Sequence, residues 1–371
     1  MRIRDNDIGR FRASLLDWYD ASRRDLPWRR TRDPYAIWAS EVMLQQTQVS
    51  RVAEYWPRFL TRFPNVRALA DASEDDVLAA WSGLGYYRRA RMLRSAARVV
   101  VEELGGTLPR TARDLRRLPG MGAYTSAAVA SIGYEEAVPA VDANAARVLG
   151  RILGLRGNPS RAESRRAIES EARRLVDPER PGDFNQAVME LGALVCTPSE
   201  PACLRCPLAR FCVAGRAPDP ASYPGAGPSQ GTVSLREAVA VVRKGDAVLL
   251  VRQEHERGWW AGLWTLPRAP LAPDDDPIGA LSHVLHDRLG VECRFGDGPI
   301  ELRYSVTRHR VSAEVFPAVW ESGDPGGASR TRWIARDDLI DVGVPAPDRA
   351  LIESVPKDGA RSADTPRTAR S

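Results

Sequence analysis

Residues 115–132 read LRRLPGMGAYTSAAVASI, and this stretch decides how the first part of the chain folds. One helix is predicted to end at Leu118, because Pro119 cannot continue it. Gly120 and Gly122 then allow a tight turn before a second helix begins, which is the pattern of a helix–hairpin–helix. These glycines let the backbone approach a ligand closely, and the N–H groups that open the second helix suit a DNA phosphate. A plain αα-hairpin without a ligand is the alternative, because glycine is common in such turns.

Amphipathic helical patterns continue on both sides of this hairpin, so the first domain is predicted to be all-α. The predicted helices span residues 11–19, 35–46, 52–62, 75–81, 89–104, 112–118, 124–132, 145–153, 164–175 and 185–195. Two of them begin with a capping box, which Ser73 forms with Asp76 and Thr111 forms with Asp114.

The pattern changes after residue 216. Residues 217–232 are rich in Pro, Gly and Ser and are predicted to be an interdomain linker. A hairpin is then predicted at 238–253, followed by one helix at 280–290 and a further strand at 311–320. The chain therefore divides into an all-α domain, a linker and an α+β domain, with a tail that is too polar to fold. These parts span residues 1–216, 217–232, 233–355 and 356–371.

Composition sets only broad limits on function. The 371 residues are 43% hydrophobic and 27% charged, which is enough for two separate hydrophobic cores. A net charge of +5 permits a polyanionic partner without requiring one. We find no signal peptide and no apolar run of membrane-spanning length, and we expect a cytosolic protein.

Four of the five cysteines lie within one short stretch, residues 196–212. They are Cys196, Cys203, Cys206 and Cys212, spaced C-x6-C-x2-C-x5-C. In a cytosolic chain such crowding indicates a metal centre rather than disulfides. Zinc sites usually have two close Cys pairs and only one is present here, so the spacing favours a cubane iron–sulfur cluster while leaving zinc open.

The stretch 36–49, AIWASEVMLQQTQV, places a carboxylate where the core is expected. At helical spacing Ile37, Glu41 and Leu44 share one face, and burial there would raise the pKa of Glu41 so that it holds a proton.

A second carboxylate stands out in residues 137–152, AVPAVDANAARVLGRI. Asp142 follows a short apolar run and opens a helix, where nearby N–H groups would keep it ionised. The simpler interpretation is a helix N-cap, for which Asp is among the best residues. A protonated acid and an ionised carboxylate together suit cleavage of a glycosidic bond. The sequence does not show whether Glu41 and Asp142 meet.

These motifs, in this order, resemble the helix–hairpin–helix DNA glycosylase superfamily that includes endonuclease III. Within it, residues 26–49 (LPWRRTRDPYAIWASEVMLQQTQV), 81–91 (WSGLGYYRRAR) and 184–196 (FNQAVMELGALVC) are similar to adenine DNA glycosylases of the MutY type. The resemblance covers residues 11–212 almost continuously.

The resemblance implies a substrate, a cofactor and a reaction. It implies a monomeric, nucleoid-associated enzyme that binds double-stranded DNA in which adenine is mispaired with 8-oxoguanine or guanine. Adenine would be flipped out and removed, leaving an abasic site, and a [4Fe-4S] cluster would support DNA binding. Glu41 would protonate adenine at N7, and Asp142 would stabilise the sugar cation or bond to it transiently until water arrives.

The resemblance also implies supporting residues around these two acids. Asn144 and Tyr124 would orient them, Arg29 and Gln186 would contact the flipped adenine, and Trp28 would line its pocket. Strand-cleaving relatives of the endonuclease III type carry a lysine at the position of Tyr124, and it forms a Schiff base. Tyrosine cannot do this, so a monofunctional glycosylase is expected.

The space left by a flipped base must be filled by other side chains. Gln46 and Thr47 match the wedge of the family, and Tyr86 matches an aromatic ring that stacks beside the opposite base. A polar helix end and a buried ring are the alternatives for these residues.

The second domain resembles the Nudix-like domain with which the family recognises 8-oxoguanine, and residues 257–270 (RGWWAGLWTLPRAP) carry that resemblance. Its helix at 280–290 has no glutamate to hold a metal, so nucleotide hydrolysis is not expected. The family reads 8-oxoguanine with a Phe-Ser-His loop, which corresponds here to Thr307, Arg308 and His309. Only the histidine agrees.

Two other functions remain open from the sequence. A bifunctional glycosylase/lyase would need an amine nucleophile near Asp142. A non-catalytic mismatch-binding protein would bind the same duplex without releasing a base.

Overall fold

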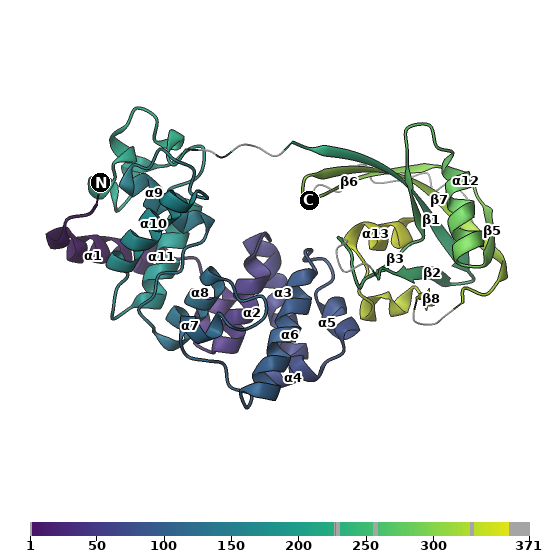
Figure 1. Ribbon diagram of the computed structural model, residues 1–371, viewed down its shortest axis with the longest axis horizontal. Helices are drawn as coiled ribbons and strands as arrows, with labels where there is room; N and C mark the ends of the chain where they lie inside the picture. The colour runs from purple at the N-terminus through teal and green to yellow at the C-terminus, as the bar shows by residue number, and fades with distance from the viewer. Residues whose placement is uncertain (1, 226, 228–230, 255–258, 327–329, 356–371) are drawn as a thin grey trace. The chain divides into compact units, whose positions relative to one another are not determined.

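The computed structural model describes all residues except 1, 226, 228–230, 255–258, 327–329 and 356–371 (Figure 1). The chain forms two compact units. The first contains Met1–Asp71 and Met92–Ser229, and the second contains Ala72–Arg91 and Gln230–Ser371. The predicted disorder of residues 356–371 lies outside the described residues. None of the helices within the described ranges is long and apolar enough to cross a membrane.

The first unit is helical, as predicted. Its α-helices are α1 (Asp5–Ser22), α2 (Pro34–Leu44), α3 (Val49–Arg62), α4 (Val66–Asp71), α6 (Arg88–Glu103, whose first residues belong to the second unit), α7 (Ala112–Leu115), α8 (Ala123–Tyr134), α9 (Ala143–Leu153), α10 (Ala162–Leu175) and α11 (Pro181–Leu194). Short 3-10 helices are η1 (Pro27–Arg30), η2 (Cys203–Arg205), η3 (Ala209–Phe211), η4 (Ala214–Arg216) and η5 (Pro220–Ser222). Helix α4 was not predicted.

One hydrophobic core joins α1, α9, α10 and α11, which lie together in Figure 1. On α9, Ala145, Val148, Leu149 and Ile152 recur at helical spacing and all are buried in it. Hydrophobic burial of this kind fixes how α9 and α11 pack, and these are the helices that carry several of the predicted site residues.

Helix α2 is buried on all sides rather than on one stripe. Every residue from Tyr35 to Met43 is buried, so the helix has no polar face. It ends at Leu44, two residues earlier than predicted, and Gln46 adopts a left-handed backbone with φ 58°. Helix α7 ends at Leu115 rather than at Leu118, because the chain turns at once toward the hairpin.

The second unit contains α5 (Glu74–Ala80) and an α+β fold. The strands are β1 (Val233–Lys244), β2 (Ala247–Arg252), β3 (Trp264–Thr265), β4 (Arg268–Leu271), β5 (Val291–Phe295), β6 (Ile300–Val306), β7 (His309–Gly323) and β8 (Thr331–Ala335). The remaining helices are α12 (Pro277–Ser282), which continues as the π-helical η6 (His283–Arg288), η7 (Asp337–Asp341) and α13 (Ala346–Ser354).

These strands form one mixed sheet within the described residues, with the central order β3-β2-β1-β7-β5. β1 and β7 run parallel, whereas the other paired strands are antiparallel. Alternate residues of β1 face two cores: Val239 and Val241 pack with α13, and Ala240 and Val242 pack with α12 and η6. Helices thus cover both faces of the sheet (Figure 1), which is why residues 238–243 of β1 form a continuous buried run. The hairpin predicted at residues 238–253 is formed by β1 and β2.

Part of the predicted linker is packed rather than free. The Arg151 guanidinium donates from Nε to the carbonyl oxygen of Tyr223 at 2.7 Å, and Pro224 lies against Gly150 of α9. The first residues of the stretch 217–232 therefore belong to the first unit.

Candidate active site

Glu41 is a buried acid in the middle of α2. It is 5% exposed, and the Tyr124 hydroxyl lies 2.5 Å from its Oε2 atom. Burial raises the pKa of Glu41 from 4.5 to about 7. The hydrogen bond from Tyr124 and the positive charge of Arg29 oppose this rise, and the negative charge of Asp142 adds to it. A substantial fraction of Glu41 therefore carries a proton near neutral pH.

Asp142 is the N-cap of α9 and accepts a hydrogen bond from the Ala145 backbone N–H at 2.6 Å. Burial raises its pKa, so desolvation outweighs the capping effect that the sequence suggested. The Ala145 N–H, the charge of Arg147 and hydrogen bonds from Asn144 oppose that rise. Because the charge of Asp142 contributes to the pKa of Glu41, the fold places both carboxyl groups in one electrostatic site.

Tyr124 is the second residue of α8, directly after the hairpin. Its hydroxyl also lies 3.1 Å from Met189 Sδ on α11, and burial raises the pKa of this hydroxyl well above its ordinary range. A neutral phenol is therefore held against the Glu41 carboxyl. The helix that follows the hairpin therefore supplies Tyr124 as a polar partner for Glu41.

Asn185 on α11 is a structural support that we did not predict. Its Nδ2 donates to Ser131 Oγ at 2.9 Å and to the Val138 carbonyl at 2.8 Å. Its Oδ1 accepts from the Ala140 N–H at 3.0 Å. These three bonds fix the segment that leads to Asp142. Nothing in the local sequence marks Asn185 for this role beyond its amide group.

Three residues expected at the base pocket have defined partners. Trp28 on η1 is buried, with its ring centroid 6.4 Å from that of Trp56. Both Nη atoms of Arg29 donate to the Glu190 carboxylate, at 3.0 and 2.9 Å. Gln186 donates back to the Gly182 carbonyl of its own helix at 3.3 Å. Contacts of Trp28, Arg29 and Gln186 with a base stay predictions.

The two hairpin glycines serve different needs. Gly120 has φ +73°, and a Cβ there would lie 2.7 Å from Met92 Cβ. Gly122 is the N-cap of α8 with φ −74°, and a Cβ there would meet nothing within 4 Å. Gly120 is thus required by the fold itself, whereas the space around Gly122 leaves room for a ligand to approach the start of α8.

Gln46 follows α2 and is exposed, with a positive φ that non-glycine residues rarely adopt. Its neighbour Gln45 donates to Thr125 Oγ1 on α8 at 3.2 Å, and Thr47 donates its N–H to the Leu44 carbonyl at 3.4 Å. Gln46, the strained residue, therefore lies between two residues that are held by hydrogen bonds, Gln45 and Thr47. Such backbone strain is concentrated at functional sites, which is consistent with the expected wedge.

Helices α9 and α11 touch at Gly192, beside the catalytic candidates. We predict that Gly192→Ala forces α9 to move, because the added Cβ would lie 2.7 Å from Asn144 Cβ and 3.1 Å from the Asn144 carbonyl oxygen. Overpacking should lower the free energy of unfolding by about 1–3 kcal/mol, measured by denaturant titration. Gly9→Ala in α1 is the control, since a Cβ there meets nothing within 4 Å. Equal stability of the two variants would contradict this packing.

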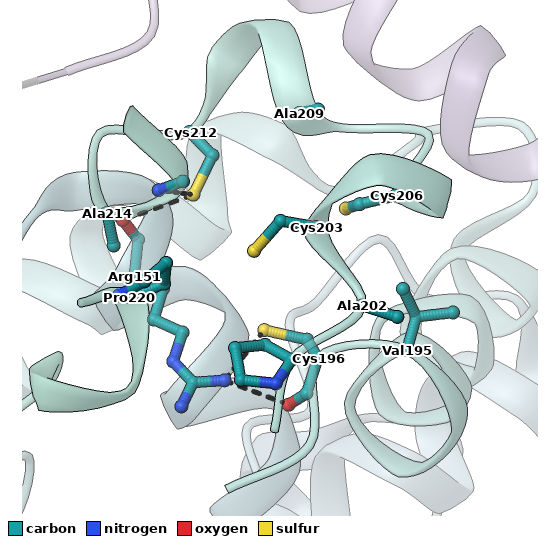
Figure 2. Close-up of a pocket in the computed structure, with 12 residues that line it drawn as sticks. Arg151, Val195, Cys196, Ala202, Cys203, Cys206, Ala209, Cys212, Ala214 and Pro220 are labelled. Atoms are coloured by element: carbon teal, nitrogen blue, oxygen red, sulfur yellow. Dashed lines mark hydrogen bonds between the residues drawn. The ribbon is translucent and has the colours of Figure 1, made fainter. Parts of the chain in front are cut away.

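The four clustered cysteines line one small cavity of about 30 Å³ with Arg151, and Figure 2 shows their sulfur atoms around a common space. None of the four forms a disulfide. Among the residues that the structure describes, no three His, Cys, Asp or Glu side chains are grouped tightly enough for a single metal ion. Four sulfurs spread around one cavity fit a cluster that takes one thiolate on each iron.

Two arginines of α9, the buried Arg151 and the half-buried Arg147, contact the segment that begins at Cys196. Arg151 donates to Cys196 Sγ at 3.3 Å and to the Thr197 carbonyl at 2.6 Å. Arg147 donates from Nε to the Cys196 carbonyl at 2.9 Å and from Nη2 to Asn144 Oδ1 at 2.8 Å. Positive charge beside the sulfurs would offset the negative charge of bound thiolates.

In the second unit, Tyr86 is 41% exposed with φ 49°, and the Arg89 guanidinium lies 5.4 Å from its ring centroid. At the tight β6–β7 turn, Thr307 also has a positive φ of 55°, and its hydroxyl lies 3.3 Å from His309 Nδ1. The His309 ring lies 4.7 Å from the ring of Trp259, centroid to centroid. This turn presents an exposed Arg308 beside the aromatic pair of His309 and Trp259, and Trp259 belongs to the stretch 257–270 that carries the resemblance to a Nudix-like domain.

Comparison with known proteins agrees with this geometry. Residues 39–174 match the model of the HhH-GPD superfamily of base excision DNA repair proteins, and residues 238–354 match the NUDIX domain model. A thermostable thymine-DNA glycosylase of known structure superposes with a TM-score of 0.52 at 30% identity, covering 56% of this chain and 96% of that one.

Curated relatives extend over much of the chain. The human adenine DNA glycosylase is 50% identical over 56% of this chain and 39% of its own length. That of Buchnera aphidicola from Schizaphis graminum is 32% identical over 69% of this chain and 74% of its own length. The chain spans about half the length of the mammalian and plant relatives it matches. With the paired carboxyl groups, the hairpin and both domain matches, this similarity shows that the chain belongs to the adenine DNA glycosylase family.

Proposed function

We propose that the protein is a monofunctional DNA glycosylase that removes adenine mispaired with 8-oxoguanine or guanine in duplex DNA. The observation that carries the proposal is the buried Glu41 carboxyl, whose pKa is raised to about 7 while the charge of Asp142 acts on it. An acid that is protonated at neutral pH beside an anion is the arrangement that glycosidic cleavage needs.

In the proposed reaction the flipped adenine accepts the proton of Glu41 at N7. The bond between C1′ and N9 then breaks, and its electron pair leaves with the base. Asp142 stabilises the positive sugar, either as an ion pair or through a transient bond to C1′. Water adds its oxygen to C1′, displaces Asp142 where that bond has formed, and gives a proton to the Glu41 carboxylate, which leaves an abasic site and free adenine. Tyr124 holds the Glu41 carboxyl, and Asn144 supports Asp142.

Gln46, Thr47 and Tyr86 are proposed to fill and flank the space that the flipped base leaves. Their supporting observations are the positive φ values of Gln46 and Tyr86 and the exposure of both side chains. Gly120 and Gly122 are proposed to let a DNA phosphate approach the start of α8.

We propose a [4Fe-4S] cluster on Cys196, Cys203, Cys206 and Cys212. Its role is structural, because it would cross-link the loop that follows α11 and hold a DNA-binding surface in shape. Iron and inorganic sulfide in equal amounts in the purified protein would support the cluster, whereas one bound zinc without sulfide would overturn it.

A single-turnover assay tests the proposed function. Enzyme in excess is mixed with duplex containing adenine opposite 8-oxoguanine, guanine or thymine, and free adenine is measured directly. We expect release from the first two duplexes and none from the third. Cutting of the strand without alkali, or trapping of the protein on DNA by borohydride, would instead indicate a glycosylase/lyase. Binding of the mismatch without release of adenine would indicate a non-catalytic protein.

We predict that Arg308→Ala weakens the preference for 8-oxoguanine over guanine, since Arg308 stands at the exposed β6–β7 turn beside His309. Loss of one good base contact should reduce the ratio of the two excision rates by roughly tenfold or more. Arg310→Ala is the matched control, because it removes the same charge two residues further on, from an exposed position of β7. If Arg308→Ala lowers both excision rates alike and leaves their ratio unchanged, Arg308 contacts only phosphate. An equal loss of the ratio in Arg310→Ala would mean that the effect is not specific to Arg308.

A further inference from the structure

Glu190 is a buried carboxylate to which the proposed mechanism gives no role. It lies on α11 and is 1% exposed. Arg24 donates to it from the backbone N at 2.9 Å, from Nε at 2.9 Å and from Nη2 at 2.6 Å. Arg29 donates from Nη1 at 3.0 Å and from Nη2 at 2.9 Å. Despite its burial, these bonds hold the pKa of Glu190 at about 2, so it is ionised at any pH at which the protein works.

These bonds leave the Arg29 guanidinium little freedom. Its Nη1 also donates to the Arg24 carbonyl at 3.0 Å, and its Cζ lies 5.5 Å from the ring centroid of Tyr19. The side chain is 12% exposed. A guanidinium held on three sides keeps one position, and from that position its charge lowers the pKa of Glu41.

Helix α11 approaches Glu41 through a second contact as well. Met189, the residue before Glu190, places its Sδ 3.1 Å from the Tyr124 hydroxyl that bonds to Glu41. The groups that act on Glu41 are thus Tyr124 from α8, Asp142 at the start of α9 and Arg29 from η1. Helix α11 contacts two of these three groups directly, one through Met189 and one through Glu190.

We propose that Glu190 is a positioning residue that holds the Arg29 guanidinium beside Glu41 and prevents it from forming an ion pair with that acid. This inference rests on the proposed function, in which Glu41 must carry a proton. A guanidinium released from Glu190 is free to pair with Glu41, because its charge already acts on that carboxyl from its held position. Direct pairing with Arg commonly lowers the pKa of a carboxyl by about 1–3 units, which would deprotonate the acid at neutral pH. Glu190 therefore protects the proton of Glu41 by occupying the guanidinium.

A merely structural role for Glu190 would have a different consequence. If Glu190 only tied η1 to α11, its loss would lower stability and slow the reaction by the same factor at every pH. A positioning role changes the pH at which activity is lost. The pH profile therefore separates the two roles.

The test measures single-turnover release of adenine between about pH 5 and pH 9 for wild type and Glu190→Gln. Wild type should lose activity above about pH 7, where Glu41 gives up its proton. In Glu190→Gln the midpoint should move down by about one pH unit or more, so that the variant is roughly tenfold slower near neutral pH and close to wild type at pH 5. Glu169→Gln, an exposed position on α10, is the charge-matched control and should leave the profile unchanged.

Two further variants keep the test decisive. Combining Glu190→Gln with Arg29→Gln removes the guanidinium and should return the midpoint toward that of wild type. Glu190→Asp keeps the charge and should retain much of the wild-type profile, and it serves if Glu190→Gln does not fold. A wild-type midpoint in Glu190→Gln, whatever its absolute rate, would overturn the proposal.

A readout without substrate separates this proposal from the proposed function. Carboxyl-labelled Glu41 can be titrated by NMR in the free protein, and its midpoint should be lower in Glu190→Gln than in wild type. If wild type releases no adenine, the proposed function fails, yet this titration still decides the role of Glu190. Identical Glu41 midpoints in both proteins would contradict it.

Discussion

Glu41→Gln is expected to slow the release of adenine by roughly 10²–10⁴-fold, the usual contribution of a general acid. Glutamine has the size of glutamate and can still accept the hydrogen bond of Tyr124, but it has no acidic proton to give to the base. The rate is measured in single turnover on duplex with adenine opposite 8-oxoguanine. Binding of that duplex should change little, because the substitution leaves the surface of the protein intact.

The same variant should show how the buried Glu41 carboxyl makes the free energy of unfolding depend on pH. The pKa of Glu41 is raised in the folded protein from 4.5 to about 7. The contribution of Glu41 to the free energy of unfolding is fully present below pH 4.5 and is lost as the pH rises through about 7. Across that range wild type should lose about 3 kcal/mol relative to Glu41→Gln, because each pK unit corresponds to about 1.4 kcal/mol.

Denaturant unfolding of both proteins at several pH values measures this difference, and any fixed effect of the substitution cancels in the comparison. A parallel pH dependence of the two proteins would show that Glu41 titrates normally. Glu41 would then be ionised at neutral pH and could not serve as the general acid, even if Glu41→Gln released adenine more slowly.

Asp142→Asn is expected to slow adenine release by roughly 10³-fold, because the variant removes the negative charge that faces the developing sugar cation. Asparagine is as good an N-cap as aspartate, so it can still accept the Ala145 N–H bond that begins α9. The fold should therefore survive, and the loss should appear in the rate of the chemical step rather than in DNA binding.

Asp276→Asn is the matched control for this variant. Asp276 is the N-cap of α12, where its side chain accepts from the N–H groups of Ile278 and Gly279. Both variants exchange a capping carboxylate for an amide, but only Asp142 lies beside Glu41. Similar rates for the two variants would mean that Asp142 serves α9 only as a cap. The two stabilities, measured by thermal unfolding, should be affected to a similar small extent.

Local patterns in the sequence were enough to predict the helical first unit, the hairpin and the sheet-forming second unit. Pro119 and Gly120 mark the turn by their own backbone preferences, and Ser73 caps α5 as predicted by accepting the Asp76 backbone N–H. Helix ends were less predictable. Helix α2 stops before Gln46, whose left-handed backbone is unusual for its residue type, so no local preference would have indicated it.

Local residue patterns were enough to identify the unusual groups: an acid in an apolar helix, an aspartate that opens a helix and four crowded cysteines. How these groups act on one another depends on the packing of helices that are distant in the chain. Tyr124 meets Glu41 across 83 residues of chain, and Glu190 meets Arg29 across 161. The shift of a pKa depends on desolvation and on charges that are close in space, and neither quantity is a property of a local stretch. The sequence was still enough to predict that burial raises the pKa of Glu41. The groups that act on this pKa, Tyr124, Asp142 and Arg29, and the contact of Arg29 with Glu190 followed from packing.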